Sequence, residues 1–197
     1  MFETAPGIKL PFPEGIPQQY EVQEGRSIRL NISFEKLGAL VQNVYELLAP
    51  PLFFVLELPL NLREEQAFGA KAGRHREVLY LDGQSLEQIR RIMERFGKLL
   101  LADGMSQFAI ASHHSREEIY VQKYKLTDLY SPSPRRFVPL LKSYGLTETD
   151  RLFTPWDSFS PEHPGECTRI CMEGLDVYQA AEILKKQGMY RARIVEE

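Results

Sequence analysis

The sequence contains one order of elements, strand, helix and strand, in three places, near residues 26–58, 77–112 and 166–195. Strands are predicted where apolar residues alternate or run together, and helices where they recur at intervals of three and four. The first two units in tandem give the ferredoxin-like order βαββαβ. We therefore predict an α+β fold with a mostly antiparallel sheet and helices on one face, to which a C-terminal βαβ unit adds strands or a second sheet.

The first two units have the most regular patterns. Residues 26–32 alternate between apolar and polar side chains, which predicts a half-buried strand, and the apolar run 52–58 predicts a central one. Ser85 and Gln88 form a capping-box sequence at the start of a predicted helix. The apolar positions of that helix are Ile89, Ile92, Met93, Phe96, Leu99 and Leu100.

The rest of the chain gives further elements. Residues 59–77 are charged and contain glycine, which predicts a flexible loop or a long hairpin connection. Residues 105–112 and 119–126 are predicted to form a hairpin, with Lys123 and Lys125 on its solvated face. In the third unit, residues 166–173 and 189–195 are predicted strands on either side of a helix.

The domain organisation follows from the proline distribution. Four prolines interrupt residues 1–25, because each removes a backbone donor and restricts the residue before it. We predict an extended N-terminal arm over residues 1–25 and a single α+β domain over residues 26–197, with a possible sub-boundary near residues 127–150.

Charge and composition limit the classes of partner that this protein is expected to bind. The 24 Lys and Arg residues against 27 Asp and Glu give a net charge of −3, which does not favour nucleic acid or anionic lipid. The longest apolar run, residues 47–56, is broken by two prolines and is too short for a membrane span. Two cysteines and an N-terminus without the features of an export signal indicate a cytoplasmic protein. Phosphate-loop, dinucleotide-binding, zinc-protease and nucleophile-elbow motifs are absent from the sequence, so no cofactor is predicted.

Residues 154–165 (TPWDSFSPEHPG), called here the Trp loop, hold the only tryptophan and three prolines. This segment is too proline-rich for a helix and too aromatic for an idle linker, so it predicts a structured loop. Trp156, Asp157 and Phe159 are candidate binding residues, because tryptophan and nearby charges are typical of interaction hot spots. The alternative is structural: Trp156 anchors the loop, and Asp157 bonds to its own backbone as a turn residue.

Two other constellations suggest different functions. His113, His114 and Asp157 are candidate catalytic residues of a hydrolase or transferase if separate loops bring them together. The alternative for the histidines is a solvated hairpin tip. Tyr124, Arg135 and Arg136 belong to a stretch that interleaves aromatic and basic side chains, as RNA-binding surfaces do, but strand alternation favours a core face backed by a solvated face.

A metal site is not predicted. His163, Cys167 and Cys171 recur at intervals of four, which would place three ligands on one face of a helix. Because this segment is predicted as a strand, the two cysteines would lie roughly 13 Å apart, too far for a shared zinc or a disulfide.

The leading hypothesis is a non-catalytic cytoplasmic binding or regulatory module that contacts another protein through its loops. A hydrolase or transferase using His113, His114 and Asp157 is the alternative, and RNA binding is a weaker one. Residues 189–195 are a candidate edge strand for a homodimer. No membrane partner is expected.

Overall fold

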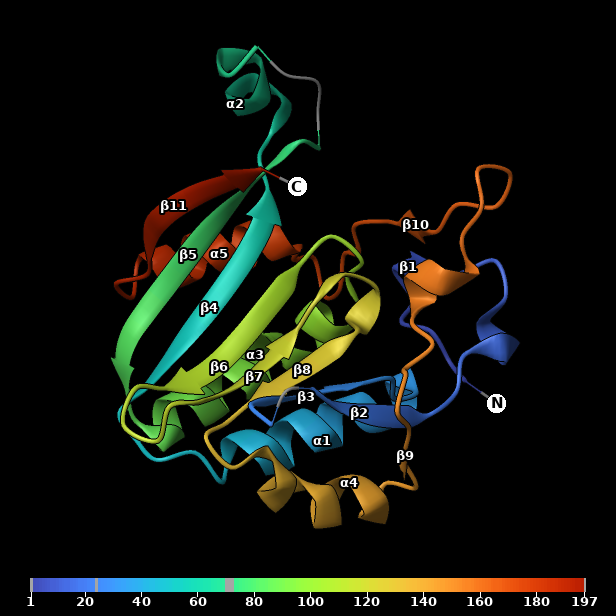
Figure 1. Ribbon diagram of the computed structural model, residues 1–197. Coiled ribbons are helices and arrows are strands. Elements are labelled where there is room, and N and C mark those ends of the chain that lie inside the picture. The colour runs from blue at the N-terminus through green and yellow to red at the C-terminus, as the bar shows by residue number, and fades with distance from the viewer. Residues whose placement is uncertain (1, 24, 70–72, 197) are drawn as a thin grey trace.

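The computed structural model describes residues 2–23, 25–69 and 73–196. In this part of the chain, a nine-stranded sheet has its strands in the order β11, β5, β4, β6, β7, β8, β3, β2 and β9 (Figure 1). Neighbouring strands are antiparallel, except that β2 and β9 are parallel. The bounds are β2 (Gln19–Gln23), β3 (Ser27–Leu30), β4 (Leu52–Pro59), β5 (His75–Gln84), β6 (Gln107–Ser112), β7 (Glu117–Val121), β8 (Thr127–Tyr130), β9 (Thr147–Glu148) and β11 (Tyr190–Glu196).

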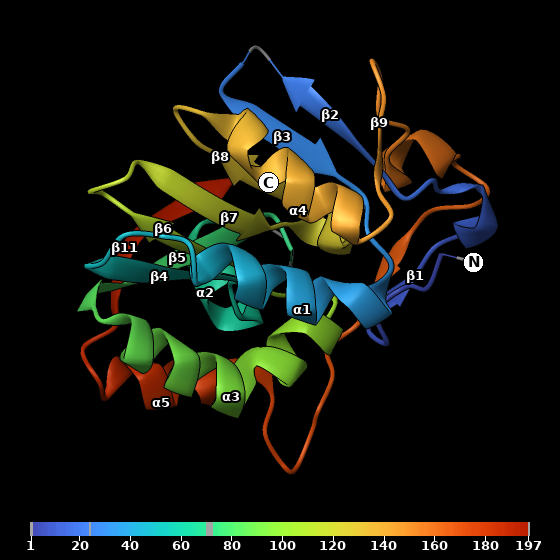
Figure 2. The same cartoon turned by 90° about the horizontal axis from the view of Figure 1, so that it is seen from below.

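Helices cover one face of this sheet. Figure 2 shows α1, α3 and α5 side by side beneath the strands. The capping box predicted at Ser85 is present and begins α3, and a second capping box at Asp176 begins α5. The helices are α1 (Phe34–Tyr45), α2 (Leu62–Ala67), α3 (Leu86–Ala102), α4 (Val138–Ser143) and α5 (Val177–Lys185), and the 3-10 turns are η1 (Pro13–Gly15), η2 (Lys123–Lys125), η3 (Pro134–Phe137) and η4 (Pro155–Ser158).

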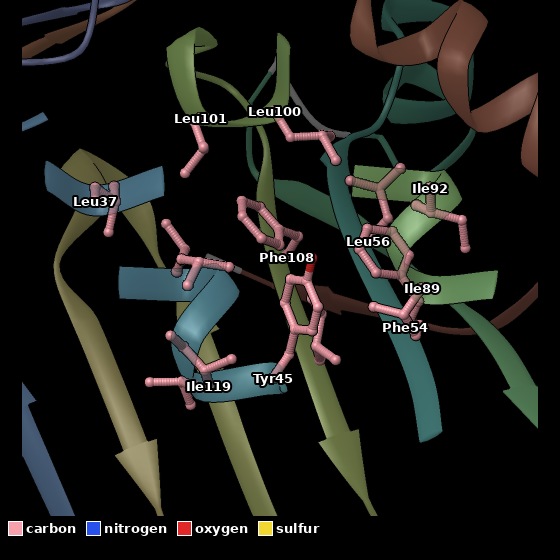
Figure 3. Packing of buried hydrophobic residues seen from close by; sticks show 14 of the residues in the cluster. Leu37, Tyr45, Phe54, Leu56, Ile89, Ile92, Leu100, Leu101, Phe108 and Ile119 are labelled. Carbon is pink, nitrogen blue, oxygen red and sulfur yellow. The ribbon is translucent and has the colours of Figure 1, made fainter. Parts of the chain in front are cut away.

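The main core lies between the sheet and these helices. Phe54 and Phe108 stack at 6.1 Å between ring centroids on neighbouring strands, and Leu37 of α1 and Ile89 of α3 are buried above the same face (Figure 3). The apolar stripes of the helices meet the inward residues of β4, β6 and β7, which is the burial that defines an α+β layer pair. The α+β class and the mostly antiparallel sheet are confirmed.

The spatial order of the strands differs from that of a ferredoxin-like plait. The elements β3, α1, β4, β5, α3 and β6 do follow one another as βαββαβ, with α2 inserted between β4 and β5. In a plait the first strand would lie between the third and the fourth. Here β7 and β8 lie between β6 and β3, because short connections pair each with the strand before it.

The C-terminal unit divides between two sheets. The predicted strand 166–173 is reduced to β10 (Glu166–Cys167), which pairs with β1 (Ile8–Lys9) in a separate two-stranded sheet. β11 instead joins β5 at the edge of the main sheet. The predicted order of strand, helix and strand is present in the third unit, but its two strands enter different sheets, because the N-terminal arm supplies the partner of β10.

The predicted N-terminal arm is partly integrated into the body. Ala5, Ile8, Leu10 and Ile16 are buried in a small apolar cluster, and Gln19–Gln23 forms β2 of the main sheet. At the other predicted sub-boundary, β8 belongs to the same sheet, and α4 packs on the core through buried Leu141.

Two predicted segments have a different local structure. The predicted strand 119–126 ends at Val121 and continues as η2, where Tyr124 and Lys125 have φ values of 57° and 59°. This change of direction buries Lys125, whose Nζ donates to the carbonyl oxygens of Leu100 (2.9 Å) and Ser106 (3.2 Å). The prediction of a solvated Lys125 is therefore wrong.

Within the segment 59–77, Pro59 belongs to β4 and residues 75–77 belong to β5, and the long hairpin connection between the two strands contains α2. Buried Glu65 accepts hydrogen bonds from the backbone nitrogens of Arg74 (2.9 Å) and His75 (2.8 Å). Residues 70–72 lie outside the described part of the chain.

Candidate functional site

The open face is the side of the main sheet opposite α1, α3 and α5, and it is turned toward the viewer in Figure 1. A second apolar cluster lies there, separate from the main core. Its members are Phe53, Val55, Val78, Ala109 and Ala111, with Tyr80, Tyr120 and Val195 packed against them. Since successive strand residues point to opposite faces, these side chains alternate with those that enter the main core.

A hollow of about 340 Å³ opens on this face. Its origin is the small size of Ala109, which lies on β6 directly between Val55 of β4 and Tyr120 of β7 in the strand pairing. The larger neighbours form walls around the missing volume. The residues that line the hollow are Val55, Glu57, Tyr80, Ala109, Glu118, Tyr120, Tyr130 and Arg193.

A register shift in β11 places Arg193 at the rim of the hollow. Tyr190 pairs with Tyr80, but the register shifts between Arg191 and Arg193, so that Arg193 pairs with Val78. A bulge of this kind changes which face a residue points to. Arg191 therefore contacts Glu77 (2.8 Å), whereas Arg193 lines the hollow.

The carboxylates near the hollow differ in their partners. Asp128 pairs with Arg29 through two hydrogen bonds of 2.8 and 2.9 Å, and a Glu57 oxygen lies 3.9 Å from the Arg76 guanidinium. Within the described residues, no group pairs with Glu118 or donates a hydrogen bond to it. Burial, together with the charges of Glu57 and Asp128, raises the pKa of Glu118 to about 7.

The tyrosines of the hollow are held by hydrogen bonds. The Tyr120 hydroxyl donates to Gln107 (3.0 Å), and the Tyr130 hydroxyl donates to Asp128 (3.2 Å). Burial and the Asp128 carboxylate raise the pKa of Tyr130 to about 12, so this phenol stays neutral at physiological pH. The arrangement therefore offers neutral aromatic rings beside a carboxyl group without a partner.

The Trp loop has the opposite character. The rings of Trp156 and Phe159 meet the Tyr124 ring edge to face, at 5.1 and 4.9 Å between centroids. The Tyr124 hydroxyl donates to the Gly165 carbonyl oxygen (3.2 Å), which closes the loop. Three of the predicted binding residues thus pack against one another, although Trp156 remains 42% exposed.

The remaining predicted residue of this loop, Asp157, has a local structural role. Its carboxylate accepts hydrogen bonds from the Thr154 hydroxyl (2.6 Å) and the Thr154 backbone nitrogen (2.7 Å), which completes a capping box for η4. These bonds lower the pKa of Asp157. This geometry agrees with the structural alternative, in which Asp157 is a turn residue that bonds to the nearby backbone.

The candidate catalytic residues are not brought together. The His113 ring stacks on Phe53 of β4 at 4.4 Å, and His114 is exposed in the β6–β7 connection. Figures 1 and 2 both place this connection on the left of the molecule and the η4 turn, which carries Asp157, on the right. The convergence that the catalytic hypothesis requires is absent from the described residues.

The basic residues of the proposed RNA surface are engaged in intramolecular contacts. Arg135 pairs with Glu148 (3.1 Å), and Arg136 pairs with Glu117 (3.1 Å) while lying over the Phe137 ring. The two pairs lie in different places, one at β9 and one at the first residue of β7, so the arginines do not line one row of aromatic rings.

The cysteines are free thiols. Cys167 is half-buried in β10, and Cys171 is exposed. Among the residues described, His, Cys, Asp and Glu side chains form no group of three that could hold a metal ion. Over the same residues, no helix has the length and apolar character needed to cross a bilayer.

The sequence analysis missed the residues that build the hollow. Glu57, Tyr80, Glu118 and Tyr130 come from four strands, and each looks like an ordinary solvent-facing strand residue in the sequence. Alternation could have placed each on a face, but only strand pairing shows that they surround Ala109. A scan of protein-family models, a search of curated proteins and a search of solved structures found no match to this chain.

Proposed function

We propose that this protein is a non-catalytic binding module that takes a partner protein on its open face. The observation that supports this most is the uncovered side of the main sheet, where an apolar floor is hollowed over Ala109 and ringed by tyrosines and glutamates. Tyrosine is enriched in protein interfaces because it supplies apolar area and a polar tip. A cytoplasmic location remains part of the proposal and rests on the two free cysteines.

The loop surface is the second candidate. Trp156, Phe153 and Phe12 are 42%, 41% and 48% exposed, which favours some contact at this end of the molecule. The Trp156 and Phe159 rings, however, pack on Tyr124, and Asp157 accepts the hydrogen bonds of the η4 cap. We therefore rank the open face above the Trp loop as the binding surface.

Two single substitutions separate the surfaces. Ala109→Met fills the hollow from its floor, and Trp156→Ala removes the exposed ring of the loop. Partners retained from cell extract by the wild-type protein would be purified, and their affinities for both variants measured by calorimetry. Circular dichroism and thermal unfolding confirm that each variant is folded.

We expect Ala109→Met to weaken the partner at least tenfold and Trp156→Ala to change its affinity less than threefold. The reverse pattern would move the function to the Trp loop. Binding that neither variant alters would remove both surfaces from the proposal.

A further inference from the structure

We propose that the hollow of the open face binds a lysine or arginine side chain presented by a basic segment of the partner protein. This inference rests on the proposed function and specifies the chemistry of the same site. It depends on three features, namely the walls of the hollow, the balance of its charges and its position between strands.

The walls suit a cationic group with an apolar stem. Tyr80, Tyr120 and Tyr130 line the hollow, and tyrosine rings attract cations placed over their faces. Val55 and Ala109 provide an apolar floor for the methylene groups of a long side chain. The volume of about 340 Å³ lies at the small end of the range for binding pockets.

The charges of the hollow leave one carboxyl group without a partner. Arg29 satisfies Asp128 through a bidentate contact, and Arg76 lies 3.9 Å from Glu57. Glu118 has neither an ion pair nor a hydrogen bond among the described residues. A half-buried carboxylate in this position gains from a charge-assisted hydrogen bond that an incoming cation would donate.

Arg193 does not occupy this position. It lines the hollow from β11, whereas Glu118 belongs to β7, and β5, β4 and β6 lie between them. Four strand spacings separate their backbones by roughly 19 Å. Arg193 and Glu118 therefore mark opposite ends of the hollow, and an incoming cation is expected at the end formed by Glu118 and Tyr130.

Proton binding competes with cation binding at Glu118. The charged and titratable groups around it are Glu57 on β4, Tyr120 on its own strand, Asp128 and Tyr130 on β8, and Arg29 on β3, with Arg76, Tyr80 and Arg193 farther along the face. Because Glu118 must be ionised to pair with a cation, affinity should rise between pH 6 and 8 and level off above pH 8.

The test uses short capped peptides as probes. One peptide has a single arginine in an alanine and glycine background, and the second has norleucine in place of this arginine. Arginine amide is the third probe and represents a small amine that is not part of a peptide. Each is titrated into the full-length protein while the amide signals of residues 107–121 are followed by NMR. Glu118→Gln and Ala109→Met are the site variants, and Glu87→Gln, at an exposed position of α3, is the matched control.

We expect the arginine peptide to bind at least tenfold more tightly than the norleucine peptide and than arginine amide. Glu118→Gln should remove most of this preference and its pH dependence, Ala109→Met should abolish binding, and Glu87→Gln should change neither. Equal affinity for arginine and norleucine, or no binding of either, overturns the inference. Equal affinity for arginine amide and the peptide indicates a small-amine site and overturns the assignment to a protein segment.

Failure here is distinguishable from failure of the proposed function. If Ala109→Met weakens the purified partner while the peptides show no preference for arginine, the open face binds a protein by apolar contact alone. If Ala109→Met leaves the partner unaffected, the proposed function itself is wrong.

Discussion

The Trp loop and the open face are both rich in aromatic residues, but their polar groups differ. In the Trp loop, the rings of Trp156 and Phe159 pack on Tyr124, and one oxygen of the Asp157 carboxylate accepts two hydrogen bonds from Thr154. On the open face, tyrosine rings surround a hollow, and Glu118 has no described partner. The contrast teaches that aromatic content alone does not rank the two regions, because the polar groups of the Trp loop have partners within the chain, whereas the carboxyl group in the hollow has none among the described residues.

An ionisable group with a strongly shifted pKa lies beside the Trp loop, and another lies on the open face. Next to Tyr124, burial lowers the pKa of Lys125 to about 8, yet its amine donates to two carbonyl oxygens. On the open face, burial raises the pKa of Glu118 to about 7. Lys125 therefore stabilises the connection between α3 and β6, whereas Glu118 remains available to a ligand.

The largest change in stability is expected from adding a Cβ atom at Gly165 in the Trp loop. In Gly165→Ala, the new Cβ would lie 2.3 Å from Phe159 Cζ and 2.9 Å from Tyr124 Cε1, so the aromatic cluster must shift. We expect a loss of about 3 kcal/mol in the free energy of unfolding, measured by urea denaturation. Gly15→Ala is the control, because its Cβ would meet nothing within 4 Å. A loss of less than 1 kcal/mol would show that the loop is loosely held and would reopen it as a binding surface.

Lys125→Met tests the buried amine beside the loop. In the wild type, Lys125 is neutral in the folded state above pH 8 but protonated in the unfolded chain up to about pH 10.5. Stability should therefore rise with pH through this window, by roughly 2 to 3 kcal/mol relative to Lys125→Met. Urea denaturation between pH 7.5 and 10 measures the difference, with the exposed Lys98→Met as control. Parallel pH curves for wild type and Lys125→Met would contradict burial of this amine.

Glu118→Gln gives the smallest expected change in stability. The pKa of Glu118 in the folded state is about 7, above the ordinary value of 4.5. Between pH 4.5 and 7, Glu118 is therefore protonated in the folded state but ionised in the unfolded chain. Relative to Glu118→Gln, the wild type should lose roughly 1 to 2 kcal/mol as pH rises from 4.5 to 7, after allowance for partial exposure. Thermal unfolding across this range measures the loss. A pH-independent difference would mean that Glu118 is already paired, and the contrast with Asp157 would disappear.

The sequence by itself determined the elements whose signals are local. Capping boxes at Ser85 and Asp176 begin helices because their hydrogen bonds lie within four residues. The apolar run beginning at Leu52 became a central strand, since a strand covered on both sides has apolar residues at nearly every position. The structured character of the Trp loop was also evident from its prolines and aromatic residues.

Only the tertiary structure decided which of these elements meet. The arm strand β1 pairs with β10, and the hairpin partners β7 and β8 separate β6 from β3, because strand pairing joins residues far apart in the chain. The same long-range pairing places Glu118 and Tyr130 around Ala109. The hollow exists because one small residue lies between larger neighbours from other strands, and no single stretch of sequence contains that juxtaposition.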